Sequence, residues 1–271
     1  MASARRAARA GCTILSPVSA GSKGAKEAVR GFWEARPCGG AHASAEPGSA
    51  AYFAEVEAAR DRLEPFIPAF AEFERWRGRR VLEVGVGLGT DFVRFARAGA
   101  DLHGVDLTEA AVDLVRQRLA QEGLEASVRV ADAERLPFDD ASFDLVYSWG
   151  VLHHTPDPPA AVAEVRRLVR PGGEARVMHY ARRSWVALGL WGRYGLLRAR
   201  PWRSLTDVVA DHMESPGTRA YTDAELHDLF AAFGDVRLEH FVTPYDRRVA
   251  RGLAGARGGR YGWFVGIRAR A

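Results

Sequence analysis

Cysteine and long apolar runs are scarce in this 271-residue sequence. Its two cysteines, Cys12 and Cys38, lie in different contexts, which excludes a disulfide framework and a metal cluster and leads us to expect a reducing, cytoplasmic location. No apolar run approaches the roughly 18 residues that a membrane-spanning helix needs. We therefore expect no stable membrane insertion.

Lysine is also scarce, since Lys23 and Lys26 are the only two, so positive charge comes almost entirely from arginine. The net charge of +4 is mildly basic. Richness in arginine, alanine and glycine without lysine is more typical of codon bias in a GC-rich genome than of a nucleic-acid-binding surface. We therefore expect no nucleic-acid partner.

One glycine-rich stretch organises the rest of the chain. An apolar, strand-like run that contains Glu83 is followed by Gly85, Gly87 and Gly89 and then by a helical pattern. These glycines let the backbone turn sharply and approach a ligand without a Cβ atom in the way. The helix that follows would present free N–H groups and the positive end of its dipole to an anionic group.

Two kinds of ligand fit such a turn. The dinucleotide fingerprint is G-x-G-x-x-G, but its third position here is Thr90, because the spacing is Gly85-x-Gly87-x-Gly89. The acid Glu83 just before the turn is a further feature. A glycine turn alone does not distinguish a dinucleotide from another ligand, so the distinction depends on the sequence that follows.

Downstream, strands and helices alternate, which predicts a parallel sheet with right-handed crossovers. Asp106 ends the second strand about 20 residues after the turn, where a pair of ribose hydroxyls would need an acceptor. A helix N-cap or turn acid is the alternative. Asp132 follows the third strand, where an adenine edge would lie. The predicted strands cover residues 79–84, 101–106, 126–130, 143–149 and 174–180.

Several segments together then resemble one family. Their order and spacing are those of the class I S-adenosylmethionine-dependent methyltransferase motifs, and the segment 150–157 resembles the ubiquinone/menaquinone-type subgroup, which acts on small molecules. The segments are Val81–Gly89, Gly104–Asp106, Ala131–Phe138, Ser142–Val146 and Leu168–Gly173.

The resemblance implies a fold, a function and a cofactor. The fold would be α/β, a Rossmann-like, seven-stranded, mostly parallel sheet with helices on both faces and an antiparallel last strand. The function would be methyl transfer from S-adenosyl-L-methionine to a small-molecule acceptor. The cofactor contacts would be Glu83, Gly85, Gly87, Gly89, Asp106, Leu107, Asp132, Ala133, Ser148 and Tyr52.

The sequence divides into three parts. Residues 1–27 are rich in arginine with no acid before Glu27, which is typical of disorder, although a transit peptide has the same look. Residues 28–78 contain helices that precede the first strand, so they are candidates for a lid. The aromatic side chains of this lid either contact the ligand or pack the lid onto the core. Residues 79–271 would form the methyltransferase domain.

The regular alternation of strands and helices stops after the fifth predicted strand. Residues 181–221 form a tryptophan-rich, basic-edged insertion, which we expect to be a helical cap over an apolar or aromatic acceptor, or over one that bears an anionic group. Contact with a membrane surface or a second copy is the alternative, and a homodimer stays open. Two strands at 235–242 and 261–268 would form an antiparallel pair. The substrate contacts would be Trp149, His154, Tyr180, Trp185, Phe32 and Trp33.

Methyl transfer from a sulfonium is an in-line displacement, so the protein mainly has to position the acceptor and exclude water. A base is needed only if the acceptor must lose a proton. His153 and His179 are the predicted catalytic residues, because histidine titrates near neutral pH, whereas His154 is expected to pack or to bond backbone. The histidine pair has no nearby third ligand, so we expect no metal.

Two other functions stay open. One is a non-catalytic methyltransferase-like domain that binds the cofactor or a partner protein, since intact binding residues do not prove turnover. The other is an RNA methyltransferase. The stretch Ser148-Trp149-Gly150-Val151 lacks the Asn/Asp-Pro-Pro-aromatic motif, which disfavours methylation of a nucleobase nitrogen.

Overall fold

The computed structural model describes residues 22–213, 215, 217–250 and 259–271. The disorder predicted for residues 1–21 therefore lies outside the described residues. Helix α1 spans Ser22–Ala35, so residues 22–27 are helical and the boundary predicted after residue 27 is too late. Val29 of this helix is buried, which gives α1 an anchor that composition alone did not indicate.

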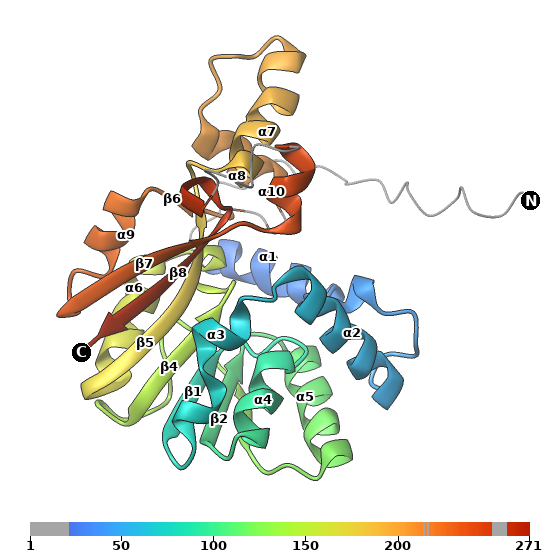
Figure 1. Cartoon of the computed structure of the whole chain (residues 1–271), viewed down its shortest axis with the longest axis vertical. Coiled ribbons are helices and arrows are strands. Elements are labelled where there is room, and N and C mark those ends of the chain that lie inside the picture. The colour runs from blue at the N-terminus through green and yellow to red at the C-terminus, as the bar shows by residue number, and fades with distance from the viewer. Residues whose placement is uncertain (1–21, 214, 216, 251–258) are drawn as a thin grey trace, which may run out of the picture.

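A central sheet organises the fold (Figure 1). Its main path has the order β3-β2-β1-β4-β5-β8-β7, and β8 runs antiparallel to both of its neighbours while the other strands of the path are parallel. This confirms the predicted mostly parallel α/β sheet with an antiparallel last strand, and the two-residue strand β6 (Ala220–Tyr221), which pairs with β5 off this path, adds an eighth strand to the predicted seven. The strands of the path are β1 Arg80–Val84, β2 Asp101–Asp106, β3 Ser127–Val130, β4 Phe143–Trp149, β5 Val169–Ala181, β7 Asp235–Phe241 and β8 Phe264–Arg270.

Helices cover both faces of the sheet. Helices α4 (Thr90–Arg97) and α5 (Glu109–Glu122) pack on one face, and α6 (Pro158–Leu168) and α9 (Asp223–Leu229) pack on the other. Because successive side chains of a strand point to opposite faces, β4 supplies Leu145 and Tyr147 to the first core and Val146 to the second. Each core therefore draws on the same strands.

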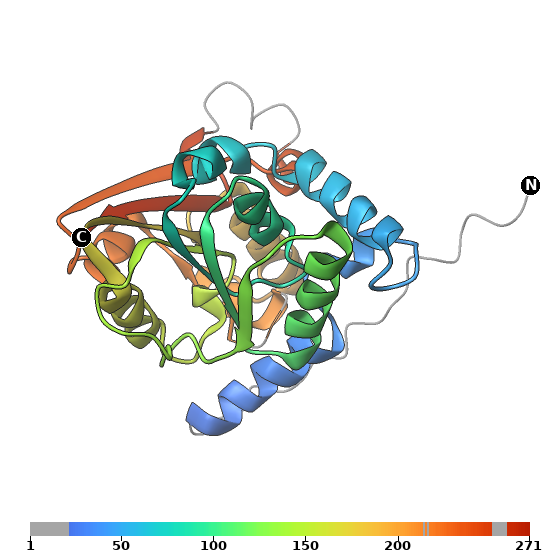
Figure 2. The ribbon, with the colours of Figure 1, turned by 90° about the horizontal axis from the view of Figure 1, so that it is seen from below.

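The segment before β1 folds as the helices α1, α2 (Ala50–Leu63), α3 (Ile67–Ala71) and the 3₁₀ helix η2 (Phe73–Trp76). Figure 2 shows α1 and α2, in blue, beside the green α5. The Glu34 carboxylate of α1 accepts hydrogen bonds from the backbone N–H groups of Glu109 and Ala110 at 3.2 and 3.0 Å. An acid at the positive end of a helix dipole is favourable, so this contact helps to hold α1 against the start of α5.

The insertion after β5 forms α7 (Trp185–Tyr194), η4 (Leu196–Arg198), α8 (Leu205–His212) and the two-residue strand β6 (Ala220–Tyr221), which pairs with β5. Helix α10 (Pro244–Val249) packs on α7. Figure 1 shows α7, α8 and α10 at the top of the molecule, with α1 between them and the lower strands. Within the described ranges, no helix is both long enough and apolar enough to cross a membrane.

The strand order places a ligand site. Strand β1 lies between β2 and β4, so the chain proceeds to one side of β1 and then returns to the other. Open α/β sheets bind ligands outside the carboxyl ends of the strands at such a switch point. Helices α1 and α2 precede the sheet in sequence and contribute to the wall at this end.

Candidate functional site

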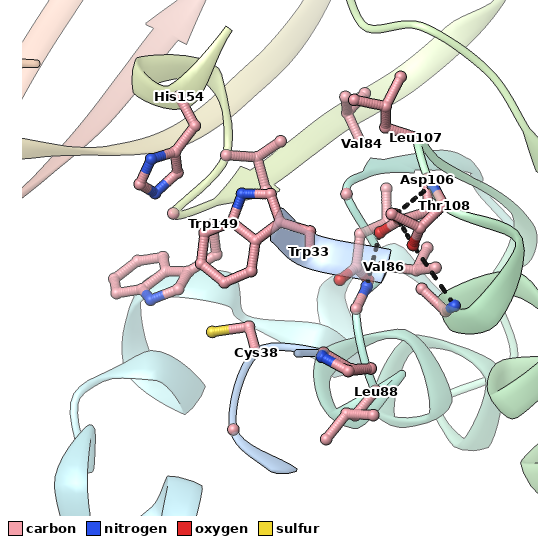
Figure 3. Close-up of a pocket in the computed structure, with 18 of the residues that line it drawn as sticks. Trp33, Cys38, Val84, Val86, Leu88, Asp106, Leu107, Thr108, Trp149 and His154 are labelled. Carbon is pink, nitrogen blue, oxygen red and sulfur yellow. Dashed lines mark hydrogen bonds between the residues drawn. The ribbon is translucent and has the colours of Figure 1, made fainter. Parts of the chain in front are cut away.

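A cavity of about 270 Å³ lies at the carboxyl ends of β1, β2 and β4. Its wall comes from α1 and α2, from the turn after β1, from the ends of β2, β4 and β5, and from residues of α10 and β8. Figure 3 shows Trp33 and Cys38 on one side of it, and Asp106 and His154 at separate positions along it. The wall is acidic near the glycine turn and aromatic beyond β4 and β5.

The glycine turn needs its glycines for different reasons. Gly85, Gly87 and Gly89 all have positive φ, at 82°, 51° and 72°, a region that favours glycine. A Cβ atom on Gly85 would lie 2.2 Å from Cγ2 of Val151, whereas one on Gly87 would meet nothing within 4 Å. Gly87 therefore leaves bare backbone at the cavity, and Gly89 forms the N-cap of α4.

Asp106 ties the turn to the end of β2. Its Oδ2 accepts a hydrogen bond from the Gly87 N–H at 3.0 Å, and its Oδ1 accepts from the N–H and the hydroxyl of Thr108 at 3.0 and 2.8 Å (Figure 3). The carboxylate also lines the cavity. Three of its roughly four lone-pair positions are used by these contacts, so Oδ2 can accept one further hydrogen bond, as a ligand hydroxyl would donate.

Next to the turn lies a buried acidic cluster. Arg60 of α2 donates to Asp91 at 2.9 Å and to Glu64 at 3.1 Å. The hydroxyl of Tyr147 donates to Asp91 at 3.0 Å, and Trp149 Nε1 donates to Glu64 at 2.6 Å. One guanidinium thus serves two carboxyl groups of the cavity wall.

A third carboxyl group, Glu83, is only 3% exposed at the end of β1. Its Oε2 and the Oδ1 of Asp91 have no hydrogen-bond partner among the described residues. Burial raises the pKa of Glu83 well above its usual range, and the charges of Asp91 and Asp106 add to this rise while Arg60 opposes it. The single guanidinium of Arg60 therefore faces three carboxyl groups, so an ammonium group or another cation bound in this part of the cavity would be stabilised.

Helix α1 reaches the end of β3 through Lys26. Its ammonium group bonds to the carboxylates of Asp132 and Glu134, and Oδ1 of Asp132 accepts from the Glu134 N–H at 3.0 Å. Lys26, Asp132 and Ala133 all line the cavity. A ligand amino group at this end would share Asp132 with Lys26.

Aromatic side chains form another part of the cavity wall, which we call the aromatic end and which meets the acidic cluster where Trp149 donates to Glu64. They come from elements far apart in the sequence: Trp33 from α1, Trp149 from β4, Tyr180 from β5, Tyr245 from α10 and Phe264 from β8. Their rings would enclose a flat apolar molecule and exclude water from it.

His154 borders this aromatic end, and two hydroxyl groups contact the Nδ1 atom of its ring. Its Nδ1 lies 2.8 Å from Ser215 Oγ and 3.0 Å from Thr218 Oγ1, while its Nε2 has no hydrogen-bond partner among the described residues. Trp33 packs edge-on against its ring at 5.3 Å. Burial lowers the pKa of His154 to about 3, so the ring is neutral at physiological pH.

Most residues predicted from the sequence do line the cavity. Those brought together are Glu83, Gly85, Gly87, Asp106, Leu107, Asp132, Ala133, Trp149, His154, Tyr180 and Trp33.

His153 and His179 differ from the prediction, because neither lines the cavity and both are fully buried. Their rings lie 5.5 Å apart, and the ring of His179 packs against Tyr221 and Phe230. Burial lowers the pKa of His153 well below its usual range and that of His179 to about 3. Of His153, His154 and His179, only His154, a predicted substrate contact, lines the cavity.

Five other residues lie outside the cavity wall. Ser148 is fully buried and donates to the Val84 carbonyl at 2.9 Å, Tyr52 packs with Phe53 in a separate cluster, and Gly89 caps α4. Phe32 packs on Trp33, and Trp185 packs on Tyr261. No residue between 181 and 244 in the described part of the chain lines the cavity, so the insertion is not the expected cap.

Sequence reasoning missed the partners that helices bring to the site. Arg60 and Glu64 are four residues apart on α2, a spacing that resembles an ordinary surface ion pair of a helix. Asp91 could have been suspected, because it follows the glycine turn directly. Lys26 could have attracted attention only because it is one of two lysines in the sequence. Nothing in the sequence links Ser215 and Thr218 to His154.

Comparisons with known proteins agree with this geometry. Residues 82–177 match the family described as Methyltransferase domain. An uncharacterized protein of Mycobacterium tuberculosis is 37% identical over 172 residues, which are 61% of this chain and 60% of that protein, so the match spans about three fifths of this relative.

A ubiquinone biosynthesis O-methyltransferase of Aromatoleum aromaticum is 40% identical over 98 residues, which are 36% of this chain and 42% of that one. The structure of an S-adenosylmethionine-dependent methyltransferase from Methanosarcina mazei is similar with a TM-score of 0.53 and 20% identity, and the match covers 75% of this chain and 96% of that one. This structural likeness shows the fold.

Proposed function

We propose that residues 82–177, which match the family described as Methyltransferase domain, act as a class I S-adenosylmethionine-dependent methyltransferase, and that the chain methylates a hydroxyl group on a small aromatic acceptor. The observation that carries this proposal is the position of His154. His154 lines the aromatic end of a cavity that is lined elsewhere by carboxylates and bare glycine backbone, and its buried Nε2 has no hydrogen-bond partner among the described residues.

The acidic end of the cavity fits the cofactor. Glu83 and Asp91 each have a buried oxygen without a partner among the described residues, which suits the ammonium of the methionine part. Asp106 can accept from a ribose hydroxyl and Asp132 from the adenine amino group. Gly87 has no Cβ atom to block close approach. When bound, the cofactor supplies a methyl group that its sulfonium already activates.

The protein therefore has to orient the acceptor and keep water out. Trp33, Tyr180 and Phe264 lie on three different elements and would enclose a ring between them. The O-methyltransferase named above acts in ubiquinone biosynthesis, and an aromatic hydroxyl acceptor would match both that name and these walls.

Hydrogen bonding behind His154 supports one tautomer. The hydroxyl of Thr218 donates its only hydrogen to the Ser215 carbonyl at 2.8 Å, so Thr218 Oγ1 can only accept from Nδ1. The Ser215 hydroxyl, 3.3 Å from Thr218 Oγ1, can donate to that oxygen and also accept from Nδ1. An Nδ1–H group is thus the arrangement in which every contact joins a donor to an acceptor. Nε2 then carries the lone pair, and it is buried without a partner among the described residues.

This lone pair suits a hydroxyl acceptor. A hydrogen bond from the acceptor O–H to Nε2 directs an oxygen lone pair toward the incoming methyl group. With a pKa of about 3, the ring is too weak a base to ionise a resting phenol. The oxygen becomes much more acidic as its bond to carbon forms, so the proton can pass to Nε2 at that stage.

The tautomer can be tested without turnover. Histidine-selective ¹⁵N labelling and a long-range ¹H–¹⁵N correlation spectrum identify the protonated nitrogen of each histidine. Signals that disappear in His154→Phe belong to His154, and they should report Nδ1–H with an unprotonated Nε2. An Nε2–H tautomer would remove the proposed base.

Turnover tests the chemistry. Wild type and His154→Phe would be compared with labelled S-adenosylmethionine and a panel of phenols, catechols and hydroxyquinones. His154→Phe should lower kcat by about 100-fold while cofactor affinity by calorimetry stays unchanged. His227→Phe on the exposed face of α9 is the matched control. Equal kcat in His154→Phe would contradict the role of His154, and cofactor binding without turnover of any acceptor would favour the non-catalytic alternative.

A further inference from the structure

The insertion after β5 projects from the body of the protein. Helices α7 and α8 contact each other, and the connection between them, residues 195–204, stands at the top of the molecule in Figure 1. We call residues 195–204 the tip. The tip is ordered by its own bonds: Arg200 N–H donates to the Gly195 carbonyl at 2.8 Å, and Trp191 Nε1 donates to the Arg203 carbonyl at 2.9 Å.

The tip exposes large apolar side chains. Leu197 is 82% exposed, Trp202 is 77% exposed and Leu196 is 56% exposed. A single exposed apolar residue needs no explanation, but three within seven residues of one ordered turn form a concentrated apolar surface. Because the turn is ordered, their exposure is a property of the folded protein.

The charge around these side chains has one sign. No Asp or Glu occurs in the sequence between Glu174 and Asp207, and the tip itself carries Arg198, Arg200 and Arg203. Arg203 is paired with Asp211 of α8. Arg198 lies over the ring of Tyr194 at 5.8 Å, and no ion pair of Arg198 or Arg200 occurs among the described residues. Exposed apolar side chains and arginines therefore occur together in the tip.

This combination of exposed apolar and cationic side chains favours a membrane surface as the binding partner of the tip. Leucine and tryptophan side chains flanked by arginine are the composition of segments that lie in a membrane interface, where apolar groups enter the acyl boundary and arginine contacts anionic headgroups. A second copy of the chain would bring the same positive charge against the tip, which is unfavourable. The projecting shape also suits insertion into a yielding lipid surface.

We propose that the tip docks the protein on the surface of an anionic phospholipid bilayer. Leu196, Leu197 and Trp202 would enter the interface, and Arg198 and Arg200 would contact the headgroup phosphates. Helix α10 packs on α7, and Tyr245 of α10 lines the aromatic end of the cavity. When the tip is docked, the aromatic end of the cavity would therefore lie on the side of the protein that is nearer the bilayer. This placement does not depend on the proposed function.

The probe is a set of vesicles made of phosphatidylcholine with or without phosphatidylglycerol, with binding of the full chain measured by co-sedimentation. Wild type should bind the anionic vesicles and not the neutral ones. Each arginine near an anionic surface contributes about fivefold to partitioning, so Arg198→Glu with Arg200→Glu should lower binding by at least about 25-fold. Leu197→Glu should lower it by at least about tenfold.

Matched controls separate the tip from general charge or hydropathy. Arg62→Glu with Arg237→Glu makes the same change of charge at exposed sites elsewhere, and Val130→Glu makes the apolar-to-acid change on β3. These controls should bind like wild type, and circular dichroism should show that all variants are folded. Failure of wild type to bind anionic vesicles, or binding that the tip variants leave intact, overturns the proposal. Light scattering that shows a dimer for wild type and a monomer for Leu197→Glu also overturns it, because the tip would then join two copies.

Discussion

Replacing Arg60 by methionine should strongly destabilise the protein, and by an amount that depends on pH. The guanidinium donates to Asp91 at 2.9 Å and to Glu64 at 3.1 Å, and it lies in a cluster that also holds the buried Glu83. Methionine has a similar length but no charge. The three carboxyl groups would then share a buried site without the guanidinium that bonds to two of them.

The magnitude follows from these contacts. Each lost charge-assisted hydrogen bond is worth about 1.5–3 kcal/mol, and breaking a buried ion pair by removal of one partner costs about 3–5 kcal/mol. We therefore expect the free energy of unfolding at pH 8 to fall by about 3–5 kcal/mol. For a chain of this size, that corresponds to a fall in Tm of about 6–20 °C.

The sign of the pH dependence follows from the two raised pKa values. Burial raises the pKa of Glu64 and of Glu83, and Arg60 opposes both rises, so Arg60→Met raises both pKa values further. A carboxyl group whose pKa is raised by folding destabilises the folded state above its unfolded pKa of about 4.3. This penalty disappears as pH falls through the folded pKa. The deficit of Arg60→Met should therefore be largest at pH 8 and shrink toward pH 5.

Urea unfolding followed by circular dichroism at pH 8, 6.5 and 5 measures this deficit. Arg62→Met is the matched control, since Arg62 lies on the same helix with its side chain exposed, and it should unfold like wild type at every pH. A deficit below about 1 kcal/mol, the range of a surface ion pair, or a deficit that is equal at pH 8 and pH 5, would refute the reasoning.

Three further predictions concern the turn and the buried histidines. Asp106→Ala should weaken cofactor binding by about 1–3 kcal/mol, measured by calorimetry, and unchanged affinity would move the ribose contact elsewhere. Gly85→Ala should lower the free energy of unfolding by about 1–3 kcal/mol, because φ is 82° and the new Cβ would lie 2.2 Å from Val151 Cγ2; a variant that melts like wild type argues against this. His179 has its pKa lowered to about 3, so it stays neutral in the folded state and stability is lost as pH falls below the unfolded pKa of about 6.5. Wild type should therefore lose about 2 kcal/mol more of its free energy of unfolding between pH 6.5 and pH 5 than His179→Phe does. Urea unfolding that shows the same loss in both proteins would contradict this.

The sheet could be predicted because its signals are local. Apolar runs that end in glycine or in an acid determined β1, β2 and β4 closely, and β2 and β4 have the predicted bounds. Thr108 and Thr222 cap α5 and α9 through hydrogen bonds within a few residues. Such contacts are visible in a short window of sequence.

The site was less predictable because its decisive contacts are distant in sequence. His153 and His154 are neighbours on one 3₁₀ turn, η3 (Leu152–His154), so spacing does not tell which ring faces the cavity. Thr218 and Ser215 hold His154 from more than 60 residues away. Likewise, the tryptophans of the insertion suggested a cap, but Trp185 packs on Tyr261 because α7 projects away from the cavity.

The place of β8 in the sheet has a consequence for synthesis on the ribosome. Strand β8 (Phe264–Arg270) follows both β5 and β7 in the chain, yet it lies between them in the sheet. While the chain emerges, β5 and β7 each present an edge whose backbone groups await the same partner, and such open edges can pair with other nascent chains. The sheet closes only when Arg270 has left the exit tunnel. A premature stop before Phe264 would therefore leave β5 with an open edge and β7 without its strand partner, so the truncated protein would be prone to aggregation.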